Sequence, residues 1–94
     1  MVKMDITLTN ATGLHARPAA QFVHAANRYK DTIVKVSKNG KEIDAKSIIS
    51  IMGLGATQGT VLTLIADGPD ETEVIRVLAD LVENGFGEGA EAGC

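Results

Sequence analysis

A histidine and an arginine lie two positions apart at the start of a predicted helix, within the segment 13–18, Gly-Leu-His-Ala-Arg-Pro. The first N–H groups of a helix have no intrahelical partner and the macrodipole is positive there, so a helix start attracts anions. The same field favours the neutral, nucleophilic form of the His15 imidazole. A phosphoryl group on His15 would meet backbone amides and the guanidinium of Arg17. We therefore predict that His15 accepts phosphate, held by Arg17 and by the backbone amides of Ala16 and Arg17.

The alternative interpretation is that His15 is a surface histidine that happens to lie at a helix start. Histidine is not a favoured N-cap, and an arginine at the positive end of a helix is mildly unfavourable without an anion. Pro18 distinguishes less well between a phosphate site and a surface histidine, because prolines are common in first turns for structural reasons alone. The pairing of His15 with Arg17 favours the phosphate site.

The patterning of the remaining chain predicts the elements that position this segment. Residues 2–8 alternate between apolar and polar types, which is typical of a half-buried strand. Further strands are expected at 32–37, 41–44 and 60–66, with an Asn39-Gly40 hairpin turn between the first two. A helix is expected at 16–28, a short one at 47–52, and a last one opened by residues 68–71 and closed by residues 84–85.

The two longer helices are expected to bury one stripe each. In the first, the apolar stripe is Ala19, Phe22, Val23 and Ala26, and the polar stripe is Arg17, Gln21, His24 and Arg28. In the last, the apolar stripe is Val74, Ile75, Leu78, Leu81 and Val82.

The order β-α-β-β-α-β-α predicts an α+β fold, an open-faced β-sandwich with a four-stranded antiparallel sheet covered on one face by three helices. We expect residues 1–86 to form a single domain and residues 87–94 a flexible C-terminal tail. The stretch from Phe86 onward is rich in Gly, Ala and Glu and has no periodicity, so we expect it to fray. The few aromatic residues predict an aliphatic core.

Composition excludes several function classes. The 94 residues carry a net charge of −3, which argues against a nucleic-acid binder and suits a partner with a positive docking surface. Cys94 is the only cysteine, so no internal disulfide can form. We expect no signal peptide and no membrane insertion, and hence a cytoplasmic location.

The short helix carries two expectations, one of which concerns Ser47. It is predicted as the N-cap, and it is also a candidate phosphosite. The other is that Ile48, Ile49, Ile51, Met52 and Leu54 are too many apolar residues for one face of so short a helix. Some must stay exposed and form a docking patch unless neighbouring loops cover them. The expected partner-docking residues are Ala20, Gln21, His24, Ile48, Ile49 and Met52.

The segment 13–19 followed by Lys46-Ser47-Ile48 resembles the HPr family, the histidine-containing phosphocarriers of the phosphoenolpyruvate:sugar phosphotransferase system. The resemblance implies that His15 accepts a phosphoryl group on Nδ1 from enzyme I and passes it to the A domain of a sugar-specific enzyme II. It also implies that Arg17 contacts the phosphate and that Ser47 is the family's regulatory serine, which an ATP-dependent kinase phosphorylates. Thr12 matches a small hydroxyl residue near the active site.

The implied partners are enzyme I, enzyme II A domains, an HPr kinase/phosphorylase and a transcriptional regulator. We expect a monomer that acts as a carrier and not as an enzyme with its own turnover. No cofactor and no metal are expected, because two histidines without a cysteine or carboxylate cluster make a poor metal site.

Two rival interpretations lie within the family and one outside it. A nitrogen-branch relative would use the same histidine for regulation, and a purely regulatory relative would signal through the serine but lack the histidine. A ferredoxin-like ligand- or RNA-binding module would have the same element order. An RNA reader would need strand aromatics and a basic face, which this chain lacks. The glycine-rich stretch 53–59 precedes a strand, so it is not a dinucleotide-binding loop.

Overall fold

The computed structural model describes residues 1–10, 13–14 and 16–87. The described elements are, in order, β1 (Val2–Thr7), α1 (Ala16–Asn27), β2 (Ile33–Lys38), β3 (Lys41–Asp44), α2 (Ile48–Met52), β4 (Val61–Asp67), α3 (Glu71–Glu83) and the 3-10 turn η1 (Gly85–Gly87). This order confirms the predicted β-α-β-β-α-β-α sequence, with boundaries that differ by one or two residues.

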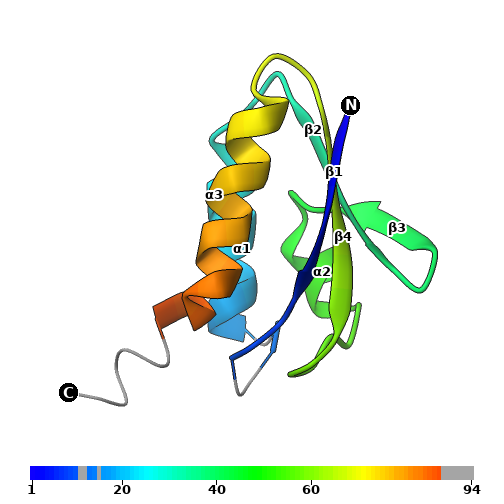
Figure 1. The fold of residues 1–94 in the computed structure, drawn as a ribbon, viewed down its shortest axis with the longest axis vertical. Coiled ribbons are helices and arrows are strands. Elements are labelled where there is room, and N and C mark those ends of the chain that lie inside the picture. The colour runs from blue at the N-terminus through cyan, green and yellow to red at the C-terminus, as the bar shows by residue number, and fades with distance from the viewer. Residues whose placement is uncertain (11–12, 15, 88–94) are drawn as a thin grey trace.

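The four described strands form one antiparallel sheet in the order β1-β4-β2-β3. The helices cover one face and leave the other open (Figure 1), which confirms the predicted α+β open-faced sandwich. In the register of β1 with β4, Val2 pairs with Ala66 and Thr7 pairs with Val61. The chain therefore leaves β1 for α1 at the end of the sheet where β4 begins, and this end positions the candidate site.

The core lies between the sheet and the helices and is mainly aliphatic, as predicted. Its largest fully buried apolar side chains are Phe22, Leu8, Ile51, Leu62, Leu64, Leu78, Val34, Val36, Val74 and Val82. Burial of this apolar surface supplies most of the stability of so small a fold.

The β2–β3 hairpin follows from its two turn residues. Asn39 has φ 53° and Gly40 has φ 84°, so both central residues are left-handed. A two-residue turn of this kind matches the twist of the strands that it joins, and Asn-Gly adopts it at low cost. The predicted hairpin is confirmed.

Some predictions of burial are wrong. Along the alternating strand β1, Ile6 is buried but Met4 is 40% exposed. In α3, Ala79 is buried and Leu81 only partly so. In α1, Ala25 is buried and Val23 only partly so. Tertiary packing, which depends on where the neighbouring elements lie, decides the edges of each stripe.

The expectation that the chain frays from Phe86 is also wrong for that residue. Phe86 is 4% exposed and belongs to the core cluster, in a turn where it takes φ 55°. Its ring adds apolar burial that offsets the cost of the left-handed backbone. Residues 88–94 of the expected tail lie outside the described residues.

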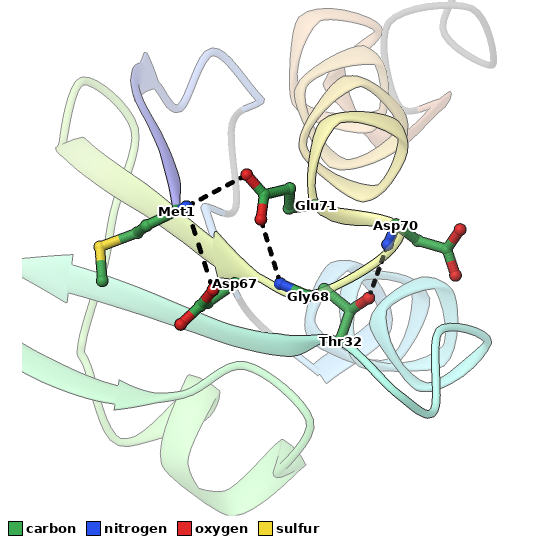
Figure 2. A network of polar contacts seen from close by, with 6 residues as sticks. All are labelled: Met1, Thr32, Asp67, Gly68, Asp70 and Glu71. Carbon is green, nitrogen blue, oxygen red and sulfur yellow. Dashed lines mark hydrogen bonds and ion pairs between the residues drawn. The ribbon is translucent and has the colours of Figure 1, made fainter.

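A polar network fixes the opposite end of the sheet, where β4 turns into α3 (Figure 2). Gly68 donates its backbone N–H to Glu71 Oε1 at 3.2 Å, and Glu71 Oε2 lies 3.1 Å from the Met1 amine. The hydroxyl of the buried Thr32 accepts from the Asp70 backbone N–H at 3.0 Å. These contacts tie the starts of β1, β2 and α3 together, far along the strands from the candidate site.

Within the described part of the chain, no helix has the length and apolar character needed to cross a membrane.

Candidate functional site

The segment that leads into α1 is held by residues on both sides of position 15. His15 and Thr12 lie outside the described residues, so the site is built from their neighbours. Leu14 is 4% exposed, and its backbone N–H donates to the carbonyl of Ala56 at 3.0 Å. Beyond position 15, Pro18 and Ala19 are buried in the first turns of α1. The chain is thus anchored immediately before and shortly after the predicted phosphate acceptor.

Gly13 is required by its backbone and by its surroundings. Its φ is +60°, which L side chains rarely adopt, and a Cβ added there would lie 2.7 Å from Thr57 Cα. It would also collide with the Ala56 carbonyl oxygen. Glycine therefore allows the segment to pack directly against the loop that precedes β4.

The first turn of α1 presents the groups expected of an anion site. The helix begins at Ala16, and both Ala16 and Arg17 are exposed. The first backbone N–H groups of a helix point out of its start, and Arg17 adds a guanidinium at the same position. Ala16 and Arg17, the residues predicted to bind phosphate, therefore lie in the exposed first turn of α1, directly after position 15.

Ser47 is the N-cap of α2, as predicted. Its backbone is extended at φ −111° and ψ 116°, and its hydroxyl accepts the Ser50 backbone N–H at 3.3 Å. Its own carbonyl accepts the Ile51 N–H at 3.0 Å, which closes the first turn. The residue is half-buried, so its hydroxyl lies at the surface boundary.

Lys46 has a structural role that its place in the sequence motif does not reveal. Its ammonium donates to the carbonyls of Tyr29 at 2.7 Å and Thr32 at 2.6 Å. Its own carbonyl accepts from Asn27 Nδ2 at 3.1 Å. Lys46 therefore fastens the start of α2 to the end of α1 and to the loop before β2.

The predicted exposure of apolar residues on α2 is confirmed. Ile49 is 82% exposed, Met52 44% and Ile48 40%, whereas Ile51 and Leu54 are buried. A helix of five residues has one inward face, and Ile51 occupies it. The three exposed side chains, Ile48, Ile49 and Met52, form what we call the α2 patch.

The expected docking residues of α1 lie on a helix that packs against α2. Ala20 and His24 are exposed. Gln21 is half-buried, and its side-chain amide donates to the Phe86 carbonyl at 3.4 Å. Gln21 and His24 also line a groove of about 260 Å³ with Val77 and Leu81 of α3. Gln21 thus has a structural contact that the sequence pattern did not indicate.

Metal binding was not expected, and the described residues contain no group of three or more His, Cys, Asp or Glu side chains suited to hold an ion.

The family model described as "PTS HPr component phosphorylation site" matches residues 2–84. The chain belongs to the HPr family of phosphocarriers. The phosphocarrier protein HPr of Cupriavidus necator is 45% identical over 89 residues, which cover 95% of this chain and 99% of that relative. The crystal structure of HPr-C-His from Thermoanaerobacter tengcongensis is 49% identical with a TM-score of 0.90, and the match covers 94% of this chain and 98% of that chain.

A third relative within the HPr family bears on function and on oligomeric state. The crystal structure of the Bacillus subtilis catabolite repression protein Crh is 45% identical with a TM-score of 0.71. The match covers 90% of this chain and 97% of that chain, and Crh forms a domain-swapped dimer. Since a relative this similar is dimeric, family membership does not support the expected monomer.

Proposed function

We propose that His15 accepts a phosphoryl group from phospho-enzyme I and that the protein passes it to the A domain of a sugar-specific enzyme II. The observation that carries this proposal is the start of α1 at Ala16, directly after His15, with Arg17 exposed in the same turn. A helix start with an added guanidinium is suited to hold the anion formed on the histidine.

The reaction is a transfer between two histidines. The lone pair of the neutral His15 Nδ1 forms a bond to phosphorus while the phosphorus–nitrogen bond to the donor imidazole breaks, and the donor recovers its electron pair. The negative charge of the moving group is stabilised by Arg17 and by the amides of Ala16 and Arg17. Because these donors are few, the group is held loosely enough for onward transfer.

The α2 patch is the proposed docking surface for both partners, together with Ala20, Gln21 and His24. Exposed isoleucine and methionine side chains can bury apolar area against a partner. The negative net charge of the chain suits a partner whose docking surface is positive.

Ser47 is the proposed site of regulatory phosphorylation by an HPr kinase. A phosphate on an N-cap is compatible with its own helix, because the first N–H groups of α2 face it. The same charge would lie next to Ile48, the first residue of the α2 patch. Docking of an apolar partner surface there would then require desolvation of the phosphate, which weakens binding.

Incubation with enzyme I and phosphoenolpyruvate, followed by intact mass measurement, tests the central proposal. We expect a gain of one phosphate that is labile in acid and absent from the His15→Ala variant. The acceptor test then adds an enzyme II A domain and follows loss of that mass. No gain in a folded wild-type protein, with an enzyme I shown to be active on another acceptor, would contradict the proposal.

The similarity to Crh favours a second candidate, a regulatory HPr-like protein that is not coupled to sugar uptake. The presence of His15 argues against a purely serine-based regulator, but a nitrogen-branch carrier would retain it. The two candidates differ in the acceptor step: a regulatory carrier would be phosphorylated by its enzyme I and would not transfer the group to a sugar-specific A domain.

A further inference from the structure

Asn10 is a buried polar residue, 4% exposed, in the segment that leads to His15. Its side-chain Nδ2 donates to the Gly13 carbonyl at 2.7 Å, and its own carbonyl accepts the Gly13 N–H at 3.2 Å. The two residues are therefore joined by hydrogen bonds that run in opposite directions. Asparagine is seldom buried, and a buried one is normally kept by its hydrogen bonds. We therefore ask what the hydrogen bonds of Asn10 do.

The peptide unit between Gly13 and Leu14 is held at both ends. Its carbonyl oxygen accepts from Asn10 Nδ2, and its N–H donates to the Ala56 carbonyl at 3.0 Å. A peptide plane with both polar groups engaged has little freedom to rotate. This plane lies one residue before His15, so its orientation sets the direction in which the chain enters the site.

Asn10 is itself fixed to the rest of the fold. A Cβ placed on Gly85 would lie 3.7 Å from Asn10 Cβ, so the turn after α3 packs closely on this residue. The hydroxyl of the preceding Thr9 donates to the Val82 carbonyl at 3.3 Å, and the Thr9 backbone carbonyl accepts from Gln58 Nε2 at 3.0 Å. A shift of α3 or of the loop before β4 would therefore move Asn10 and, with it, the Gly13–Leu14 peptide.

We propose that Asn10 is a positioning residue for phosphoryl transfer, which holds the Gly13 carbonyl inward so that only hydrogen-bond donors face the phosphate. A carbonyl released from Asn10 would be free to turn its oxygen toward the phosphoryl oxygens and repel them. The inference rests on the proposed function of His15 and deepens it, because it names a group that acts on the reaction through Gly13.

The test compares Asn10→Asp with Thr32→Val. Aspartate has nearly the size of asparagine but cannot donate when ionised. Thr32→Val also removes one hydrogen bond, which is partly buried, without a large change of shape, at the far end of the sheet. Both variants are measured for stability by urea unfolding. They are also measured for kcat and KM of phosphoryl transfer from phospho-enzyme I, and for the rate of direct labelling by phosphoramidate, a chemical donor that needs no enzyme.

We expect Asn10→Asp to lower kcat by about tenfold or more and to leave KM within about twofold. Displacement of the reacting group slows the chemical step more than it weakens binding of the partner. Direct labelling by phosphoramidate should slow as well. Thr32→Val should keep both kinetic constants near those of the wild type whatever its loss of stability. If Asn10→Asp does not fold, Asn10→Ala, which also lacks the donor, is assayed with the same criteria.

Each outcome decides the proposal. Wild-type kinetics in the folded Asn10 variant, or an equal loss of kcat in Thr32→Val, would overturn it. Labelling of the wild type by phosphoramidate but not by enzyme I would contradict the proposed function, and a slower phosphoramidate reaction in Asn10→Asp would still support the role of Asn10. A wild-type protein labelled by neither donor would overturn both.

Discussion

The Lys46 ammonium lies 2.6 Å from the carbonyl oxygen of Thr32. It also donates to the Tyr29 carbonyl at 2.7 Å, so one side chain satisfies two carbonyls in the loop between α1 and β2. A charged donor makes stronger hydrogen bonds than a neutral one. Because Ser47 follows directly, this contact fixes where the cap of α2 stands relative to α1.

Replacement of Lys46 by methionine should therefore destabilise the fold. Methionine keeps a side chain of similar length but leaves two carbonyls without their charged donor, which we expect to cost about 1–3 kcal/mol in the free energy of unfolding. Urea denaturation measures the loss. Lys30→Met, on an exposed lysine of the same loop, is the matched control and should change stability little. Equal effects of the two substitutions would contradict the role given to Lys46.

Gly13→Ala should be much more damaging than Gly55→Ala. Gly55 has φ +64°, close to the +60° of Gly13, but a Cβ at Gly55 meets nothing within 4 Å. Gly55→Ala should therefore show only the backbone cost of roughly 1–2 kcal/mol. Gly13→Ala adds a collision with the backbone at Ala56 and Thr57 and should also slow phosphorylation of His15. Thermal unfolding and the enzyme I assay are the measurements, and similar losses in both variants would show that the close contact at Gly13 is unimportant.

Ser47 variants should separate the cap from the regulatory charge. Ser47→Ala removes the acceptor of the Ser50 N–H and should cost about 1 kcal/mol, whereas Ser47→Asp keeps a capping oxygen and should remain near wild-type stability. Ser47→Asp should nevertheless raise KM for enzyme I, because its charge lies beside the α2 patch. Ser50→Ala on the same helix is the control for both readouts. An unchanged KM in the folded Ser47→Asp protein would argue against a charge-sensitive docking surface.

Ile49→Glu should weaken docking without weakening the fold. The side chain is 82% exposed, so the change in stability should stay within about 0.5 kcal/mol. KM for enzyme I should rise about tenfold if the α2 patch is buried in the complex. Val61→Glu, an exposed apolar residue on the sheet, is the control and should leave KM unchanged. If Ile49→Glu and Val61→Glu had the same KM for enzyme I, the α2 patch would not be the docking surface.

Stability toward acid should depend on Glu71. The Gly68 N–H and the Met1 ammonium lower the pKa of the Glu71 carboxyl below its ordinary value of 4.5. A carboxyl whose pKa is lowered by folding stabilises the fold above its unfolded pKa, and this contribution is lost as pH falls through the folded pKa. Glu71→Gln should therefore flatten the decline in unfolding free energy below about pH 4.5. Glu83→Gln, at the end of α3, is the control, and the expectation fails if both variants show the wild-type pH dependence.

Much of the local structure could be predicted from residue types because its causes are local. The Asn39-Gly40 turn and the Ser47 cap follow from backbone preferences and one short-range hydrogen bond each. The excess of apolar residues on a five-residue helix likewise predicted an exposed set, and Ile48, Ile49 and Met52 are that set. The helix start that makes His15 a candidate was equally visible in the order of histidine, arginine and proline.

Long-range contacts explain what the sequence pattern missed. Asn10 is hydrogen-bonded within its own turn, but its burial depends on the turn after α3, which lies more than seventy positions away in the chain. The two carbonyls bound by Lys46 and the burial of Phe86 are likewise decided by segments distant in sequence.

The sequence by itself determined the order of the elements and the caps and turns, and it predicted the phosphate-binding motif, because backbone preference and hydrophobic periodicity act over a few residues. Only the tertiary structure decided which polar groups hold that motif in place. A hydrogen bond between distant segments leaves no periodic pattern, and its partners are known only once the fold brings those segments together.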